Sequence, residues 1–240
     1  MKKPLSFLLI CAMLLGLTAC GNGGTQLPAD SVTPDNPPVN SEPADSINSD
    51  AEPSETPNST EEPELGDEPK SRALVAFFSL PGEQYEVGVV EKGNTQIIAE
   101  MIAEQTGADS FQIQATTEYP TTYDALLDVS RQENENPPSI SETVENMENY
   151  DVVFIGYPIW WGELPAIVQV FLDSYDFAGK TVIPFCTHAG SGLSGTQQSV
   201  ADLCPGAQVL DGLAVRGRTA QNEPDTALEA VTDWLQALDY

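Results

Sequence analysis

Five short apolar segments recur along residues 73–215, and they restrict the possible folds more than any other feature of the chain. Each segment is five to nine residues long and rich in β-branched or aromatic side chains, a composition typical of buried strands. The segments are ALVAFF (73–78), SFQIQ (110–114), DVVFIG (151–156), KTVIPFC (180–186) and AQVLDGLAV (207–215).

Helical patterns lie between these segments. Ile98, Met101 and Ile102 repeat at helical spacing after Asn94, and further amphipathic patterns cover 121–132, 164–175 and the C-terminal residues from about 222. Alternating strands and helices predict an α/β fold with a doubly wound, five-stranded parallel sheet covered by helices on both faces. Residues 72–240 have a suitable length for one such domain.

The N-terminus has a different composition. Lys2 and Lys3 precede the apolar run 5–17, which is typical of a secretory signal and too short for a confident membrane span. LTAC (17–20) resembles the lipobox of bacterial lipoproteins, which implies removal of residues 1–19 and lipidation of Cys20. The alternative is an ordinary signal peptide that happens to end near a cysteine. The lipoprotein interpretation places the protein on the extracytoplasmic face of the cell membrane, held by its lipid anchor.

Residues 20–71 are predicted to form a disordered tether. Residues 21–69 contain nine of the 19 prolines and 12 acidic side chains, but no lysine, arginine or aromatic residue. The remaining chain from residue 70 carries 25 acidic and seven basic side chains, a net charge of −18. This balance excludes the basic footprint of a nucleic-acid-binding protein. Either a cationic partner or simple solubility would explain it.

The cysteines and the single histidine predict no metal centre. Cys186 and Cys204 should lie on opposite sides of the sheet, too far apart for a disulfide, and serve as small buried hydrophobic residues. His188 has no clustered cysteines with which it could form a zinc site.

Ligands of open parallel sheets bind beyond the carboxyl ends of the strands, and three unusual segments should meet there. Gly93, Asn94 and Thr95 place a capping asparagine and a hydroxyl at a helix N-terminus, which favours an anion; an ordinary capped helix is the alternative. Trp160 and Trp161 adjoin each other after the third predicted strand. They could form an aromatic wall for a flat ring, or belong to a loop over the core or at an interface.

The third segment, 186–195, combines flexible glycines with polar side chains. Thr187, His188 and Ser191 offer hydrogen-bonding groups. A Ser/His nucleophile is a weaker interpretation, because the segment lacks the G-x-S-x-G elbow and a hydrolase would also need an acid and an oxyanion site.

Taken together, FS…GNT, GYPIWWGELP and PFCTHAGSG resemble the flavodoxin family, in particular its bacterial flavodoxin-like branch, over about residues 72–240. The resemblance implies the strand order 2-1-3-4-5 and non-covalently bound FMN. It implies that the FMN phosphate is held by Ser79, Gly93, Asn94 and Thr95. It further implies that the isoalloxazine ring lies between two sets of residues: Pro158, Ile159, Trp160, Trp161 and Gly162 on one side, and Thr187, His188, Gly190, Ser191 and Gly192 on the other.

The chain departs from the family pattern at residues 81–92, where about eleven extra residues separate Ser79 from Gly93. They could loop out, cover the flavin or shape a substrate mouth. The resemblance leaves three functions open: an electron carrier that docks with a redox partner protein, an FMN-dependent oxidoreductase that reduces a quinone, flavin or other small acceptor with NAD(P)H, and a non-redox binding module. His188 could be a proton donor, a flavin hydrogen-bond partner or a structural residue. The acidic domain and a phosphate without basic partners should lower the flavin potential.

Overall fold

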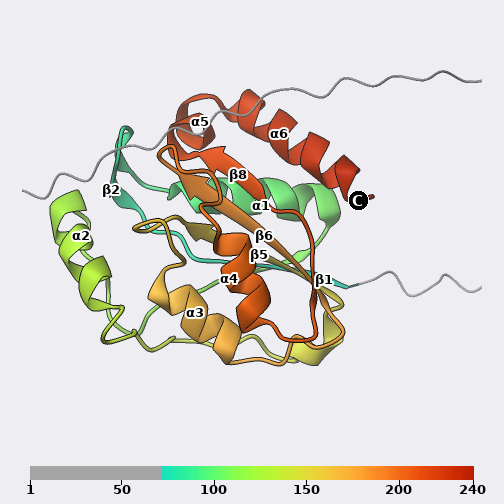
Figure 1. Ribbon diagram of the computed structural model, residues 1–240. Coiled ribbons are helices and arrows are strands. Elements are labelled where there is room, and N and C mark those ends of the chain that lie inside the picture. Colours follow the sequence, from blue (N-terminus) through green and yellow to red (C-terminus); the bar gives the residue numbers. More distant parts are fainter. Residues whose placement is uncertain (1–71) are drawn as a thin grey trace, which may run out of the picture. The chain divides into compact units, whose positions relative to one another are not determined.

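The apolar segments become strands of one parallel sheet in the computed structural model, which describes residues 72–240 (Figure 1). The predicted signal peptide, Cys20 and the tether lie outside the described residues. The sheet has the order β4-β1-β5-β6-β7, with β8 also paired to β6, so the predicted fold class and the order 2-1-3-4-5 are confirmed. Its strands are β1 (Ala73–Phe77), β4 (Asp109–Gln112), β5 (Val152–Pro158), β6 (Thr181–His188), β7 (Gln208–Val209) and β8 (Leu213–Arg216).

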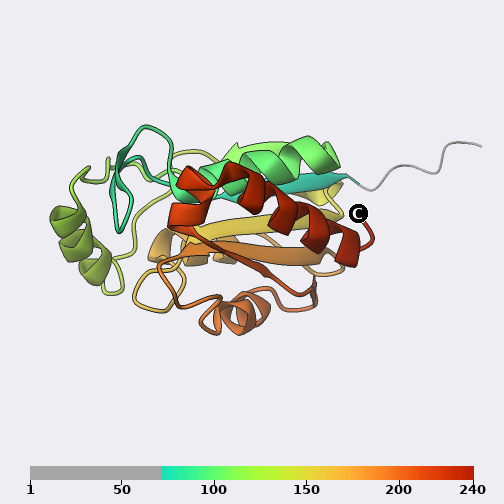
Figure 2. The ribbon, with the colours of Figure 1, turned by 90° about the horizontal axis from the view of Figure 1, so that it is seen from above.

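Helices cover both faces of the sheet, as Figure 2 shows from above. Those on one face are α1 (Asn94–Thr106), α5 (Gly217–Asn222) and α6 (Pro224–Ala237), and those on the other are α3 (Ala166–Asp173) and α4 (Thr196–Leu203). The strand register places Val75, Phe154 and Ile183 side by side in the core beneath α1 and α6. Each is fully buried, and burial of such a side chain contributes about 1.5–3 kcal/mol.

The prediction of one continuous strand at 207–215 was wrong. The segment divides into β7 and β8, which pair with successive parts of β6. The break lies opposite Pro184. The Val182 carbonyl accepts from the Leu210 amide, and residues two apart in a strand direct their backbone groups to the same side, so the backbone of Pro184 also faces residues 207–215. Because proline has no N–H, Pro184 cannot continue the hydrogen-bond ladder there. The carboxyl-terminal half of the segment, β8, therefore reaches the ligand-binding edge as a separate strand.

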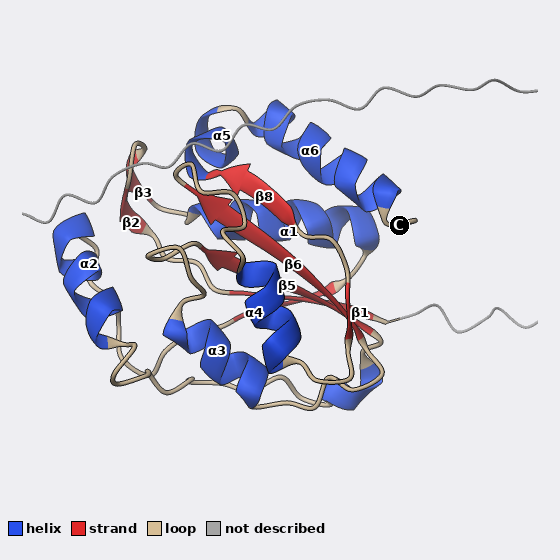
Figure 3. Ribbon diagram, viewed as in Figure 1, coloured by secondary structure: helices blue, strands red, loops and turns tan. Residues whose placement is uncertain are grey.

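The extra residues 81–92 do not form a simple loop. They contain an antiparallel hairpin, β2 (Gly82–Gln84) and β3 (Gly88–Val90). The Glu83 amide donates to the Thr121 carbonyl at 2.8 Å, and the Glu83 carboxylate accepts from the Tyr123 amide at 3.0 Å. These bonds join the hairpin to α2 (Tyr123–Gln132), which lies beside it rather than over the sheet (Figures 1 and 3).

The cysteine prediction is confirmed in part, since Cys186 and Cys204 are both free and buried. Their expected placement on opposite sides of the sheet was wrong, because both belong to the core cluster on the face covered by α3 and α4. Burial raises the pKa of each thiol to about 12, so neither is a reactive thiolate. In residues 72–240, no helix is both long enough and apolar enough to span a membrane.

Candidate functional site

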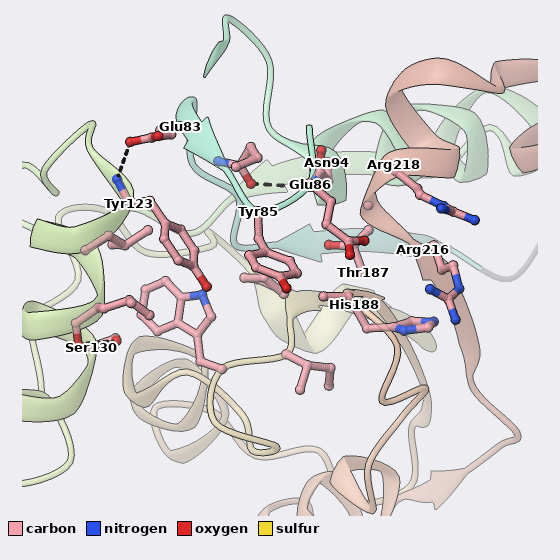
Figure 4. A pocket seen from close by; sticks show the side chains of 18 of the residues that line it. Glu83, Tyr85, Glu86, Asn94, Tyr123, Ser130, Thr187, His188, Arg216 and Arg218 are labelled. Atoms are coloured by element: carbon pink, nitrogen blue, oxygen red, sulfur yellow. Dashed lines mark hydrogen bonds between the residues drawn. The ribbon is translucent and has the colours of Figure 1, made fainter. Parts of the chain in front are cut away.

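A cleft opens where the hairpin, α2 and the ends of β5, β6 and β8 meet (Figure 4). Its volume is about 210 Å³, and it adjoins a smaller cavity of about 30 Å³ at the start of α1. Both lie at the carboxyl edge of the parallel sheet, where ligands of this architecture bind. Another cavity, of about 340 Å³, lies against residues 78–81 and 112–121, and among the predicted site residues only Ser79 lines it.

The start of α1 has free backbone amides that can bind an anion. The first four amides of a helix have no intrahelical partner. The Ser79 hydroxyl accepts from the Gln96 amide at 3.0 Å, and the Gly93 carbonyl accepts from the Ile97 amide. The amides of Asn94 and Thr95 remain for a ligand at the positive end of the helix dipole.

Gly93, not Asn94, is the N-cap of α1, so the predicted capping role of Asn94 was wrong. The Ser79 hydroxyl performs that role from the end of β1. A Cβ on Gly93 would overlap the Leu80 carbonyl oxygen and the Ser79 hydroxyl, so glycine is required by this close approach. Asn94 becomes the first helical residue, and its side chain is free to face the cavity.

Two threonine hydroxyls meet beneath the same cavity. Thr95 Oγ1 and Thr187 Oγ1 are 2.7 Å apart, and both residues are buried. The pair connects the start of α1 to the carboxyl end of β6, so it fixes the distance between the anion-binding end of α1 and the cleft. Either hydroxyl can turn toward a ligand, because a hydroxyl both donates and accepts.

Asn94 leaves an unsatisfied acceptor between the two spaces. Its Oδ1 is buried without a partner among the described residues, whereas its Nδ2 donates to Gln84 Oε1 at 3.3 Å. Buried polar groups normally find a partner, so an orphan at this place fits a hydroxyl donor of a ligand. Gln84 comes from the hairpin, lines both spaces and also donates to the Leu80 carbonyl; the sequence analysis did not identify it.

The two tryptophans have different roles. Trp160 is half-buried, with its ring edge-on to Phe78 and Tyr119 at 5.3 and 5.9 Å, and it lines both the cleft and the smaller cavity. Trp161 is 51% exposed and lines the cleft. Adjacent side chains diverge here because Trp161 adopts a left-handed φ of 55°.

Trp161 is nevertheless held firmly. Its Nε1 donates to Ser130 Oγ at 3.0 Å, and the Arg131 guanidinium lies 4.3 Å from the ring centroid. A bulky residue with positive φ is strained, and such strain concentrates at functional sites. The exposed, oriented indole is therefore suited to a planar ligand.

The hairpin adds a second aromatic side chain that the sequence analysis missed. Tyr85 is 55% exposed and lines the cleft, with its ring 5.8 Å from that of Tyr123 on α2 (Figure 4). The sequence signal was the pair of glycines, Gly82 and Gly88, which bracket a short segment of alternating character. Both have positive φ and allow the hairpin to form.

His188 is a hydrogen-bond donor rather than a base paired with serine. Its Nδ1 accepts from the amides of Gly190 and Gly192 at 2.9 and 3.2 Å, so the proton resides on Nε2. Burial and the nearby Arg216 lower the pKa of the imidazole, which favours its neutral form. Ser191 directs its hydroxyl to the Gly192 carbonyl, so the Ser/His nucleophile interpretation was wrong.

Arg216 and Arg218 bring positive charge into the cleft beside His188 (Figure 4). Neither forms an ion pair with another residue in 72–240. The expectation that the acidic domain and a phosphate without basic partners lower the flavin potential did not include these two positive charges. The sequence could have indicated their role, since both arginines directly follow the last predicted strand in a chain with only nine basic residues.

The predicted site residues fall into three groups. Seven line the cleft, and four of these also line the smaller cavity. The seven are Asn94, Pro158, Ile159, Trp160, Trp161, Thr187 and His188. Ser79 and Thr95 line the smaller cavity. The remaining five line neither space: Gly93, Gly162, Gly190, Ser191 and Gly192. Within residues 72–240, no group of three or more histidine, cysteine or acidic side chains is arranged to hold a metal ion.

The chain is similar to known flavoproteins in both sequence and fold. Residues 72–236 match the family model for flavodoxin. A candidate flavoprotein from Bacteroides eggerthii is 28% identical, with 71% of this chain and 99% of that chain covered and a TM-score of 0.56. Another from Bacteroides uniformis is 27% identical, with 69% and 98% covered and a TM-score of 0.55. A Lactobacillus acidophilus flavoprotein in complex with FMN is 20% identical, with 65% and 97% covered and a TM-score of 0.48. No curated protein matches the chain. Since the family model spans well over half of its residues, the chain belongs to the flavodoxin family.

Proposed function

We propose that this protein binds FMN non-covalently at the carboxyl edge of the sheet and transfers electrons through it. The observation that supports this best is the unsatisfied start of α1, where the amides of Asn94 and Thr95 and the orphan Asn94 Oδ1 lie next to an aromatic cleft. An anion, a hydroxylated chain and a flat ring in that order would satisfy them.

Each part of the chain has a defined task in this proposal. The α1 amides hold the phosphate, and the Ser79 hydroxyl positions the helix start through the Gln96 amide. Trp161 stacks on the ring, and His188 Nε2–H donates to a ring acceptor. When bound, FMN supplies one- or two-electron redox chemistry. His188 orients the ring rather than supplying protons, because the neutral imidazole is a poor acid.

Two modes of electron transfer fit this site. The first is an electron carrier with a redox partner protein, for which the acidic surface is suitable. The second is an oxidoreductase acting on a small molecule, and the hairpin favours it, because Tyr85 narrows the approach to the cleft and adds a ring there. We also propose that lipidated Cys20 anchors the protein at the extracytoplasmic face of the membrane.

An anaerobic titration tests the redox proposal. Protein loaded with FMN is mixed with NADH or NADPH, and the visible spectrum of the flavin is followed. Rapid bleaching indicates the oxidoreductase, whereas bleaching with dithionite only indicates the carrier. Protein that binds neither FMN nor riboflavin contradicts both and leaves the non-redox binding module.

Membrane anchoring is tested by Cys20→Ser. The wild-type protein is expected in the membrane fraction of the expressing cells, and the variant is expected to move to the soluble fraction. A wild-type protein that is already soluble would contradict the anchor.

A further inference from the structure

We propose that the outer part of the cleft is a substrate site for a planar aromatic electron acceptor that carries an anionic group. This inference rests on the proposed FMN function and names the substrate class of the same site. Tyr85 would contact the ring of the substrate opposite the flavin that stacks on Trp161, and Arg216 and Arg218 would bind its anion.

The cationic half of the site is well defined. Arg216 and Arg218 are exposed side chains on the cleft wall, and no acidic residue among 72–240 is bridged to either. Unpaired arginines are unexpected in a domain with so large an excess of carboxylates. In contrast, Arg72, Lys92 and Arg131 all form ion pairs elsewhere on the surface.

The backbone that carries the two arginines is fixed in place. Gly217 lies between them, and a Cβ there would overlap Asn94 Nδ2, so the segment packs directly against the start of α1. The Arg216 guanidinium lies about 3.9 Å from the position of a Cβ on Gly190, over the loop that holds His188. A preformed pair of guanidinium groups recognises a carboxylate, sulfonate or phosphate through charge-assisted hydrogen bonds.

The aromatic half is supplied mainly by the insertion. Only five large hydrophobic side chains of the described residues are exposed, and three of them, Tyr85, Val89 and Trp161, belong to the hairpin or the loop facing it. Tyr85 and Trp161 both line the cleft. Exposed aromatic rings that converge on one opening indicate a binding surface for an apolar group.

Glu86 at the hairpin turn also lines the cleft and would repel an anion. It therefore sets the selectivity of the site together with the arginines. Glu86→Gln is expected to tighten the binding of an anionic substrate and to leave a neutral one unaffected.

The test uses two probes of the same shape, anthraquinone-2-sulfonate and neutral 2-(hydroxymethyl)anthraquinone, titrated into the FMN-loaded protein. The sulfonate should bind more tightly. The double variant Arg216→Gln/Arg218→Gln should bind the sulfonate about tenfold less tightly or worse, with the neutral probe unaffected. The control Arg72→Gln/Lys92→Gln removes the same charge from outside the cleft and should leave both affinities unchanged.

The aromatic half is tested in the same titration. Tyr85→Ser should weaken both probes, whereas Val89→Ser on the same hairpin, whose residue does not line the cleft, should weaken neither. Equal binding of the two probes, or a double arginine variant that behaves like the wild type, would overturn the proposal.

Two further measurements distinguish whether the arginines bind the anion of a substrate or the phosphate of FMN. FMN loading is measured first by visible absorbance, so a protein that does not load FMN contradicts the proposed function, whereas loaded protein without probe selectivity contradicts the substrate site alone. FMN and riboflavin affinities are then compared. If the double arginine variant loses the preference for FMN, the arginines bind the cofactor phosphate and the substrate site is refuted.

Discussion

Replacing Trp161 with glycine should weaken FMN binding strongly while changing the free energy of unfolding only slightly. The indole is 51% exposed and its backbone is left-handed, with a φ of 55°. An L-residue pays about 1–2 kcal/mol for that conformation, which glycine adopts freely. The structure therefore gives up stability at a position whose side chain faces the cleft.

The stability terms nearly offset one another. Glycine relieves the backbone strain but removes the Arg131 contact, about 0.5–1 kcal/mol, and the Ser130 hydrogen bond, about 0.5–1.5 kcal/mol. Its greater freedom in the unfolded chain costs about 0.5–1 kcal/mol more. The expected net destabilisation is about 1 kcal/mol. Trp161→Ala loses the same contacts and keeps the strain, so it should be less stable than the glycine variant.

The effect on FMN binding should be larger. A buried tryptophan covers about 150–250 Å², so contact with the exposed half of Trp161 buries about 100 Å² of apolar surface. At about 25 cal/mol per Å² this contributes about 2.5 kcal/mol, or roughly 60-fold in Kd.

The assays are urea unfolding of cofactor-free protein and quenching of flavin fluorescence. Equal FMN affinity in the wild type and both variants would refute the role of Trp161 in binding. A glycine variant that fails to fold would refute the balance of stability terms and show that Trp161 is structural.

Three further results are expected. Thr95→Val or Thr187→Val should each cost about 1–3 kcal/mol of stability by leaving a buried hydroxyl unpaired, and the double variant should cost less than the two together; strict additivity in urea unfolding would argue against the pair. The imidazole of His188 should titrate by NMR with a pKa below 6.5, so its contribution to stability is lost as pH falls from 6.5 through that pKa, and Arg216→Gln should raise the pKa; a midpoint at or above 6.5 in the wild type would disagree with this account. Burial raises the pKa of the Glu133 carboxyl above 4.5, so wild-type stability should fall as pH rises from 4.5 through the raised pKa, and Glu133→Gln should escape that loss; parallel pH profiles of unfolding would contradict it.

The sheet was predictable because its central strands are nearly continuous apolar runs, which few other arrangements can bury. β5, for example, is buried along all but its last residue. The break between β7 and β8 was not, because its cause lies in the neighbouring strand. A missing amide at Pro184 becomes visible only when the strands are paired.

The site was predictable in position but not in detail. Motifs at three strand ends placed Asn94, Trp161, Thr187 and His188 together, since parallel strands end at one edge. The choice between Trp160 and Trp161 as the exposed ring depends on one backbone angle that the sequence does not encode locally. The contributions of Gln84, Tyr85 and the two arginines depend on how the hairpin and β8 return to this edge.

The central claim, that the start of α1 and the aromatic cleft together form a flavin site, is tested most directly by parallel titrations with FMN and riboflavin. The account predicts saturable binding of FMN with one molecule per chain and clearly weaker binding of riboflavin, because only FMN offers the phosphate that the α1 amides require. Failure to bind FMN, or equal affinity for the two flavins, would contradict it.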